Sequence, residues 1–460
     1  AYTEGVNAGL ESLREKPFEY VLLRLEPAQW QPEDSVLVLY AMYFVLNDDT
    51  GDAESDRGLL EDILGPEMAA FLAPLGTEWD APVVGEVFET PQIPGVEIPA
   101  GGVEAASNHR AQAGFLKAEA LVGSNNWAVG GSCTADGRAI LANDMHLGMA
   151  VPNTWYRAML EWPAEDGCHG NHRLVGVTLP GSPALVAGSN TRVAWGFTNS
   201  QGDWSDLVIV DVASEDPSRY ATSDGWLTIE NRPETILVRD GEPEEFNVRT
   251  TIWGPIVDQD HLGRPRAVRW IAHDEGGANL AMLGLEHAAT VHEAFEVANR
   301  CGIPPQNFVC ADADGNIGWT IIGRIPRRFG FSGRVPTSWA DGSHGWEGWL
   351  EPEDYPRVIN PDGGIIWTAN ARVVSDEMLE IVGHGGYDLG ARARQIRDDL
   401  LALEQPDEKD MLAVQLDDRA LFLERWRSLL LDLLDGDAIG EDPKRSEFRV
   451  LIDTTWTGHA

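Results

Sequence analysis

Lysine is scarce in this chain of 460 residues, and acidic residues outnumber basic ones throughout. Only four lysines occur, and 34 basic residues stand against 74 acidic ones, which gives a formal net charge of −40 at pH 7. A surface this acidic repels nucleic acid and anionic membranes, so we expect neither as a partner. Because the acidic residues are spread along the chain, we interpret them as a solvated surface suited to high salt, where self-repulsion is screened.

The sequence also lacks the patterns of zinc modules and membrane spans. Its four cysteines, Cys133, Cys168, Cys301 and Cys310, form no C-x-x-C pair, so we expect no zinc knuckle. Their spacing leaves both disulfides and buried thiols open. No apolar run approaches the roughly 18 residues that a membrane-spanning helix needs, and the sequence shows no signal peptide.

Glycine and proline are abundant, and three segments differ in pattern. The 48 glycines and 27 prolines indicate many turns. Residues 1–75 favour helices, including the largely apolar run "EDSVLVLYAMYFVL", whereas residues 76–123 lack a helical period and resemble a spacer that is functional or removable. Residues 124–460 begin with short β-prone runs and end in amphipathic helices. Strands flanked by helices, without βαβ alternation, predict a layered α+β fold.

The tripeptide Gly-Ser-Asn occurs twice, but only residues 123–125 lie between the spacer and a β-prone run. The second copy, residues 188–190, fits an ordinary turn, which is also what the first copy would indicate on its own. A serine hydroxyl is a poor nucleophile without a base, and a serine at a chain terminus carries that base as its own α-amine. Cleavage between Gly123 and Ser124 would create such a serine, and the glycine leaves the scissile carbonyl open.

Four sequence blocks extend this interpretation: "GSNNWAVGGSCTADGRAILANDMHL", "PGSPALVAGSNTRVAWGFTNSQGDWSDL", "PPQNFVCADADGNIGW" and "NPDGGIIWTANAR". On these blocks the chain resembles the penicillin acylase family of N-terminal nucleophile hydrolases. The resemblance implies a four-layer αββα sandwich with three segments: a helical α-chain segment (1–75), a spacer (76–123) and a β chain (124–460). The β chain is expected to contain a β-rich insert and to stop before the family's usual C-terminal portion. The resemblance also implies a periplasmic or extracellular location.

The resemblance further implies a catalytic set. Ser124, freed when the precursor cuts itself, is the expected nucleophile. His146 is expected to hold the Ser124 amine and hydroxyl. The backbone N–H of Asn199 and the side-chain amide of Asn307 are expected to stabilise the oxyanion of the tetrahedral intermediate. Arg328 matches a charged residue placed near the site.

A structural calcium ion is also implied, held by Glu54, Asp203 and Asp206, whereas no organic cofactor is expected. Hard carboxylate oxygens in an irregular cage suit Ca²⁺. The alternative is that these three residues are ordinary acidic surface residues, which are common in a chain with so many acidic side chains. The run "DADGN" at 312–316 begins like a calcium loop, but no glutamate closes it at the twelfth position, so we interpret it as a hairpin turn.

Together these features predict a self-processing amidohydrolase, acting on linear amide bonds, whose partners are a small-molecule amide and its own α and β chains. The run "WGFTNSQGDWSDL" favours a penicillin or cephalosporin type of acylase. The alternative with the same chemistry is an acylase of homoserine-lactone signals or lipopeptides. The alternative of another class is a calcium-stabilised module whose tryptophan-rich β region binds a ligand without turnover.

Overall fold

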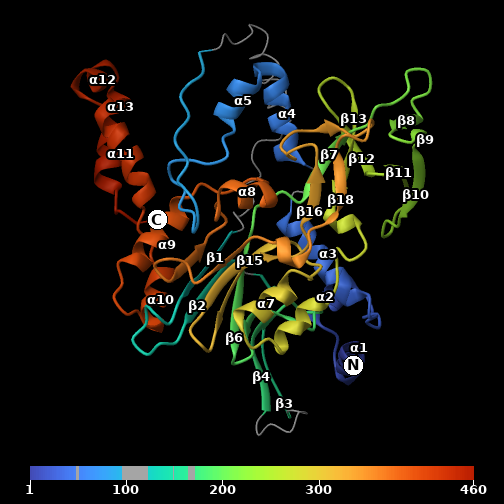
Figure 1. Cartoon of the computed structure of the whole chain (residues 1–460), viewed down its shortest axis with the longest axis horizontal. Coiled ribbons are helices and arrows are strands. Elements are labelled where there is room, and N and C mark those ends of the chain that lie inside the picture. Colours follow the sequence, from blue (N-terminus) through green and yellow to red (C-terminus); the bar gives the residue numbers. More distant parts are fainter. Residues whose placement is uncertain (48–50, 96–122, 149, 164–170, 460) are drawn as a thin grey trace.

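The computed structural model describes residues 1–47, 51–95, 123–148, 150–163 and 171–459. Most of the expected spacer, residues 96–122, and Cys168 lie outside the described residues. Two β-sheets pack face to face at the centre, and helices cover their outer sides (Figure 1). This α+β arrangement agrees with the predicted fold class.

The smaller central sheet has three strands in the order β2–β1–β20, namely Ile140–His146, Gly123–Val129 and Ile365–Thr368. Its middle strand, β1, is buried along its whole length because it has a strand on each side and a layer on each face. Helices α9 (Ala391–Leu401) and α10 (Glu408–Gln415) cover the outer face. Trp127 of β1 is fully buried there, and its indole N–H points to the sulfur of Met411 at 3.1 Å.

The larger central sheet has seven strands in the order β19–β15–β14–β6–β5–β4–β3. In that order they span Arg357–Ile359, Ile317–Ile322, Gln306–Asp312, Val193–Asn199, Leu185–Ser189, Asn171–Thr178 and Tyr156–Pro163. Helix α7 (Val291–Ala298) packs on β14 and β15 and begins at Thr290, whose side chain accepts a hydrogen bond from the Glu293 N–H, as expected of a helix cap.

One side chain ties the two central sheets together. Asn143 of β2 donates hydrogen bonds to the carbonyl oxygens of Asn125 and Phe197, both at 2.9 Å, and accepts one from the Phe197 N–H at 3.2 Å. Because Asn125 belongs to β1 and Phe197 to β6, this amide fixes the position of the strand that carries Ser124 relative to the facing sheet.

A β-rich lobe lies beside this sandwich, at the upper right of Figure 1. Its six-stranded sheet runs β10 (Glu230–Ile236), β11 (Glu244–Thr251), β12 (Gly254–Gln259), β13 (Pro265–Trp270), β7 (Ser205–Ile209) and β17 (Thr337–Ser338). Two hairpin-like pairs complete it, β16 (Pro326–Phe329) with β18 (Gly345–Trp349), and β8 (Arg219–Thr222) with β9 (Gly225–Thr228).

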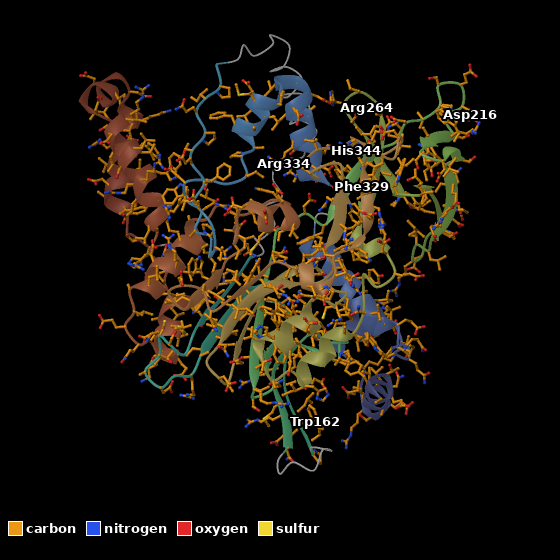
Figure 2. All side chains as sticks on the ribbon, in the orientation of Figure 1. Trp162, Asp216, Arg264, Phe329, Arg334 and His344 are labelled. Atoms are coloured by element: carbon orange, nitrogen blue, oxygen red, sulfur yellow. The ribbon has the colours of Figure 1, made fainter. Side chains whose placement is uncertain are left out.

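The N-terminal segment is helical, as the sequence predicts: α1 (Tyr2–Ser12), α2 (Phe18–Leu23), α3 (Asp34–Leu46), α4 (Asp52–Leu64) and α5 (Pro66–Leu72). Pro66 begins α5 and so separates it from α4, with Gly65 at a positive φ of 79° between them. Arg334, labelled in Figure 2 close to these helices, donates a hydrogen bond to the Ala73 carbonyl, and its own carbonyl accepts one from Arg57 of α4. Tyr43 of α3 donates to the Gly277 carbonyl at 2.6 Å, so these helices are anchored to the rest of the chain.

The predicted hairpin at 312–316 is also present, because Asp312 accepts hydrogen bonds from the N–H groups of Asp314 and Asn316 and closes the β14–β15 turn. The C-terminal part is helical: α8 (Asp376–Val382), α9, α10, α11 (Leu421–Leu433), α12 (Gly436–Glu441) and α13 (Pro443–Thr455). Within the described residues, no helix combines the length and apolar character needed to cross a membrane.

Candidate active site

Ser124 lies near the start of β1, nine-tenths buried, with both of its backbone polar groups held by side chains from distant segments. Its N–H donates to Asn370 Oδ1 at 2.7 Å, and its carbonyl accepts from Arg392 Nη1 at 2.8 Å. Arg392 Nη2 in turn donates to Asn370 Oδ1 at 2.9 Å. The three residues therefore form one closed hydrogen-bonded unit around the backbone of the expected nucleophile.

The strand register separates the side chains of this region onto two faces. Gly123 pairs with His146, and Ser124 pairs with Met145, in the antiparallel ladder of β1 and β2. Because side chains alternate along a strand, Ser124 and Met145 share one face while Gly123 and His146 share the other. Since Arg392, on α9, also reaches Asn125 Oδ1, the Gly123 face is the helix-covered one, and the Ser124 side chain is directed toward the seven-stranded sheet.

Gly123 occupies a crowded position on that helix-covered face. A Cβ atom there would lie 3.3 Å from His146 Nδ1 and Arg392 Nη2 and 3.4 Å from Asn370 Oδ1. These distances are shorter than ordinary van der Waals contacts, so the three polar groups pack tightly against the backbone that precedes Ser124. Glycine is the residue that lets them do so.

His146 makes its hydrogen bonds on the same face. Its Nε2 lies 2.9 Å from Asp144 Oδ2 and 3.4 Å from Asn125 Nδ2, and its ring is about one-third exposed. The histidine therefore faces the backbone of the expected cleavage position, and the strand register directs the Ser124 side chain to the other face. The expected role of His146 in holding the hydroxyl stays a prediction.

The side-chain amide of Asn307 was expected to stabilise the oxyanion, and that role stays a prediction; the amide that binds the Ser124 backbone is that of Asn370. The Asn307 nitrogen donates to Thr198 Oγ1 at 3.0 Å and to the Asn199 carbonyl at 3.4 Å, and its oxygen accepts from Trp319 Nε1 at 3.0 Å. Asn370 follows β20, pairs with Ser124, and adopts a φ of +61°, which asparagine tolerates better than most residues.

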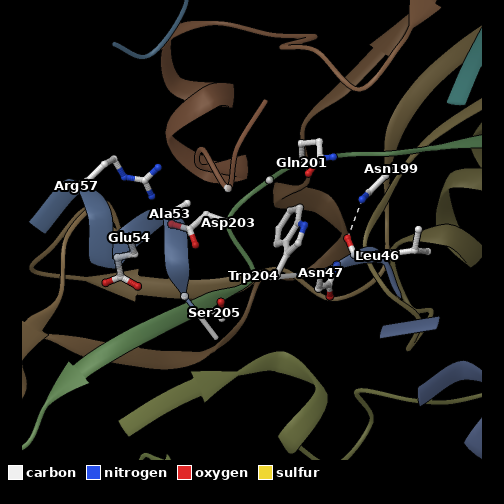
Figure 3. A pocket seen from close by; sticks show the side chains of 13 residues that line it. Leu46, Asn47, Ala53, Glu54, Arg57, Asn199, Gln201, Asp203, Trp204 and Ser205 are labelled. Atoms are coloured by element: carbon white, nitrogen blue, oxygen red, sulfur yellow. Dashed lines mark hydrogen bonds between the residues drawn. The ribbon is translucent and has the colours of Figure 1, made fainter. Parts of the chain in front are cut away.

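Asn199 lies next to this unit, at the end of β6. Its carbonyl accepts a hydrogen bond from Asn370 Nδ2 at 3.0 Å, and its side chain donates to the Leu46 carbonyl at 2.7 Å, the dashed line in Figure 3. Asn370 thus connects Ser124 to the strand end that carries the expected oxyanion donor, the Asn199 N–H. That role of the N–H stays a prediction.

Arg328 was expected near the site, a placement that stays a prediction, and its side chain lies among acidic side chains. Its Nε lies 2.9 Å from Asp206 Oδ2, and its Nη2 lies 3.2 Å from Asp203 Oδ1 and 3.0 Å from the Asp203 carbonyl. The arginine that contacts Ser124 is Arg392. Sequence signals for both missed residues existed, since Asn370 ends the block "NPDGGIIWTANAR" after a buried apolar run and Arg392 lies in the amphipathic run "ARARQI".

The three expected calcium ligands gather around Arg328. Glu54 of α4 and Asp203 flank one polar pocket, shown in Figure 3, and Glu54 Oε2 accepts a hydrogen bond from the Leu207 N–H at 2.8 Å. Burial raises the pKa of Glu54 well above its usual value, and the neighbouring charges of Asp206 and Asp203 raise it further. Glu54 Oε1 and Asp206 Oδ1 are buried, and neither has a hydrogen-bond partner in the described structure.

The Ser124 side chain borders an apolar pocket of about 600 Å³, counting its open mouth. Helix α3 supplies one wall, and strands of both central sheets supply others. Its lining is Leu39, Met42, Leu46, Ser124, Met145, Leu147, Trp155, Leu179, Val186, Phe197, Met282, Ile303, Pro304 and Gln306. A buried serine at the edge of an apolar cavity can present its hydroxyl to the carbonyl carbon of a ligand whose apolar part fills the cavity.

Comparison with known proteins agrees with this geometry. A family model described as penicillin amidase matches residues 1–459. Acyl-homoserine lactone acylase QuiP of Pseudomonas aeruginosa is 28% identical over 445 residues, covering 93% of this chain and 51% of that protein. Penicillin acylase 2 proenzyme of Pseudomonas sp. strain SE83 is 31% identical over 401 residues, covering 82% and 48%. The chain thus spans about half the length of the curated relatives it matches.

A solved structure shows the same fold. Thermostable penicillin G acylase from Alcaligenes faecalis superposes with a TM-score of 0.59 at 23% sequence identity, covering 73% of this chain and 59% of that one. The stacked central sheets and their helical layers are therefore shared with a known enzyme.

Proposed function

The chain belongs to the penicillin amidase family, and from this premise we propose that it forms the nucleophile-bearing part of a self-processing amide hydrolase. Ser124 is the nucleophile, and the Gly123–Ser124 bond is the cleavage position. The observation that carries the proposal is the hydrogen bond from the Ser124 N–H to Asn370 Oδ1, with the serine side chain at the mouth of an apolar pocket. The group that would become the α-amine is thereby already held.

Self-processing requires two steps. Ser124 Oγ attacks the Gly123 carbonyl carbon, and the C–N bond breaks to leave an ester and a free amine. Water then hydrolyses the ester, which gives a Gly123 carboxylate and an N-terminal serine. The crowded polar groups around Gly123, His146 Nδ1 and Arg392 Nη2 among them, support this position because they can hold the scissile peptide in one conformation.

Turnover then uses the new terminus. The neutral α-amine accepts the Ser124 hydroxyl proton, Oγ attacks the substrate carbonyl, and the substrate amine leaves with a proton. Water releases the acid from the acyl-enzyme. Asn370 keeps the amine in place through Oδ1, and the Asn199 N–H stabilises the oxyanion, with the Asn307 side-chain amide as the expected second donor.

The two products of cleavage stay associated in this proposal. Helices α3 and α4 contribute the Tyr43 bond to Gly277, the Leu46 carbonyl that binds Asn199, and the Glu54 bond to Leu207. These contacts join residues before the cleavage position to residues after it. The partners of the chain are then its own two segments and a small-molecule amide.

Calcium binding at Glu54, Asp203 and Asp206 is part of the proposal. The fit is supported by two buried oxygens that have no hydrogen-bond partner among the described residues, Glu54 Oε1 and Asp206 Oδ1. A bound cation would favour the ionised form of Glu54, and three ionised carboxylates would then exceed the Arg328 guanidinium by the charge of one divalent ion. Against it, no three acidic, histidine or cysteine side chains of the described residues are close enough to form a ready ligand set. The ion would have to draw the carboxylates together.

The acyl group of the substrate defines the finer activity. A penicillin amidase type of specificity was favoured by the sequence, while relatives bear the names of both penicillin acylases and acyl-homoserine lactone acylases. Both specificities use the same nucleophile and the same held amine.

The test is the state of the purified chain. Denaturing electrophoresis should show two polypeptides, and Edman sequencing of the second should read Ser-Asn-Asn-Trp. Ser124→Ala should give one polypeptide and no amide hydrolysis, whereas Ser189→Ala, in the second Gly-Ser-Asn copy, should behave as wild type because Ser189 only accepts a local bond from the Thr191 N–H. Amide hydrolysis by Ser124→Ala, or an uncleaved active protein, would overturn the proposal, and an uncleaved, inactive wild type would favour a binding module.

A further inference from the structure

We infer that the pocket beside Ser124 takes an unbranched, uncharged aliphatic acyl chain, and that it discriminates against both anionic and phenylacetyl-type acyl groups. The inference rests on the proposed function, because it assigns the acyl group of that same site. It is carried by the identity, origin and packing of the side chains that form the pocket.

The chemistry of the lining excludes a charged acyl group. Among the described residues that line the pocket, the polar side-chain groups are the Ser124 hydroxyl, the Gln306 amide and the Trp155 indole N–H, and none of these carries a charge. The Gln306 amide nitrogen is directed to the Pro305 carbonyl at 2.9 Å and to Asn199 Oδ1 at 3.4 Å. A carboxylate on the acyl chain would lose its water without gaining a cation or a set of donors, which is strongly unfavourable.

Three methionine side chains make the wall of the pocket flexible. Met42 of α3, Met145 of β2 and Met282 of the short helix η2 (Ala281–Glu286) reach it from three separate elements. Methionine is unbranched and has three rotatable bonds, so its side chain adapts to a flexible partner more easily than a ring or a branched chain does. A pocket lined by such adaptable side chains can pack against a flexible polymethylene chain in several of its conformations.

The pocket offers few aromatic rings that could bind a phenyl group of the substrate. A phenyl group is best bound by rings that offer it a free face or edge. The ring of Phe197 is buried and packs against Phe308 at a centroid distance of 5.8 Å, so it belongs to the core of the larger sheet. Trp155 is the remaining aromatic residue of the described lining, and the rest of the apolar wall is aliphatic or thioether.

The inner wall sets the length of chain that fits. Leu39, Met282 and Ile303 are each at most 5% exposed and join the core between the larger sheet and α7. Among these three, Met282 has the longest and most flexible side chain. A bulkier residue at Met282 should therefore shorten the pocket from within.

The first experiment compares turnover of p-nitroanilides of octanoic, butanoic, phenylacetic and glutaric acid by the purified, processed protein. We expect kcat/KM to rise about fourfold for each methylene group buried, octanoyl to exceed phenylacetyl by at least about tenfold, and glutaryl to be the poorest substrate. A higher kcat/KM for phenylacetyl or glutaryl than for every alkanoyl group would leave the proposed function standing and overturn this inference.

The second experiment changes the inner wall. Met282→Trp should lower kcat/KM for octanoyl by at least about tenfold, since several methylene groups lose their place, and leave butanoyl within about twofold. Met282→Leu, which nearly conserves volume, is the matched control and should keep the wild-type profile. Met42→Trp, at a half-buried position of α3, provides a second test if Met282→Trp does not fold. An unchanged chain-length profile in a folded tryptophan variant contradicts the inference.

The third experiment does not depend on catalysis. Calorimetric titration of the wild-type protein should show octanoate binding more tightly than phenylacetate, with the difference reduced in Met282→Trp. If no anilide is hydrolysed but octanoate binds in this Met282-dependent way, the proposed function fails and the assignment of the pocket stands. If phenylacetate binds more tightly than octanoate, the assignment fails whatever the turnover.

Discussion

The backbone N–H of Ser124 donates a hydrogen bond to the side-chain oxygen of Asn370, 246 positions further along the chain, over 2.7 Å. The same asparagine binds the Asn199 carbonyl through its nitrogen and accepts from Arg392 through its oxygen. One amide therefore joins the start of β1, the end of β6 and helix α9. The predictions on the site follow from this connection.

Asn370→Ala should lower kcat by about 10²-fold, because the Ser124 amine loses the acceptor that positions it. Precursor should also accumulate on denaturing gels. Asn360→Ala is the matched control, since Asn360 also has a positive φ of 44° and so suffers a similar backbone penalty, but its side chain binds Ile317 and Asn316. Equal losses in the two variants would mean that Asn370 acts only through stability.

Arg392→Lys should slow both processing and turnover, by about tenfold or more, because one ammonium cannot reproduce the fork that reaches Ser124 O, Asn125 Oδ1 and Asn370 Oδ1. Processing rates from pulse-labelled precursor and steady-state kcat measure the two effects. Arg394→Lys, two residues along the same helix, should be nearly neutral because Arg394 binds the Glu78 carbonyl. A larger effect at Arg394 than at Arg392 would contradict this assignment.

Gly123→Val should block self-cleavage, since its side chain would be forced against His146, Arg392 and Asn370. Gly123→Ala, whose single Cβ lies 3.3 to 3.4 Å from them, should only slow it. Gly148→Ala introduces a methyl group with no neighbour within 4 Å and serves as the control. The measurement is the half-time of appearance of the second polypeptide, and rapid cleavage of Gly123→Val would refute the geometry.

Arg328→Met should destabilise the protein by about 3–5 kcal/mol, because Asp203 and Asp206 would keep buried charges without their cation. Added calcium should restore part of this loss and should raise the midpoint of thermal unfolding of the wild type, whereas a chelator should lower it. Arg327→Met, at the adjacent position, should have a small effect, since Arg327 contacts the Trp349 carbonyl only at 3.4 Å. No response to calcium in either protein would remove the calcium proposal.

Stability should also depend on pH through His384. Burial, together with the charges of Arg57, Arg334 and Arg372, lowers the pKa of His384 from an ordinary value of 6.5 to about 4 in the folded protein. The unfolded chain therefore binds a proton first, so the stability conferred by the neutral ring is present above pH 6.5 and is lost as the pH falls toward 4. The loss should be at most about 3 kcal/mol.

The variant for this measurement is His384→Asn, which keeps an acceptor for the Gly386 N–H but does not titrate. Denaturant midpoints between pH 6.5 and 4.5, measured in the single-chain Ser124→Ala background, should fall less steeply in the variant. Parallel curves would show that another group is responsible.

Local sequence patterns predicted much of the fold and singled out Ser124 as the expected nucleophile, because the relevant signals are close in sequence. The predicted turn at 312–316, for example, depends on hydrogen bonds between neighbours within a few residues. The Gly-Ser-Asn copy at 123–125 was distinguished from the copy at 188–190 by what lies on either side of it.

The partners of Ser124 could not be chosen in the same way. Asn370 reaches it only because β20 pairs with β1, which places Thr368 opposite Asn126. Asn307 lies in a motif that indicates a site residue just as strongly, but its amide is hydrogen-bonded to Thr198 and Trp319. Arg328 likewise forms ion pairs with buried carboxylates. These carboxylates come together only because α4 packs against β7.

The apolar pocket takes one wall from α3 and the others from Ser124 and residues that follow it in the chain. Once the peptide bond before Ser124 is broken, these walls belong to separate polypeptides, so what the site accepts is decided jointly by two molecules that no longer share a backbone. Replacing only the N-terminal partner could then retune selectivity while the reacting groups stay untouched.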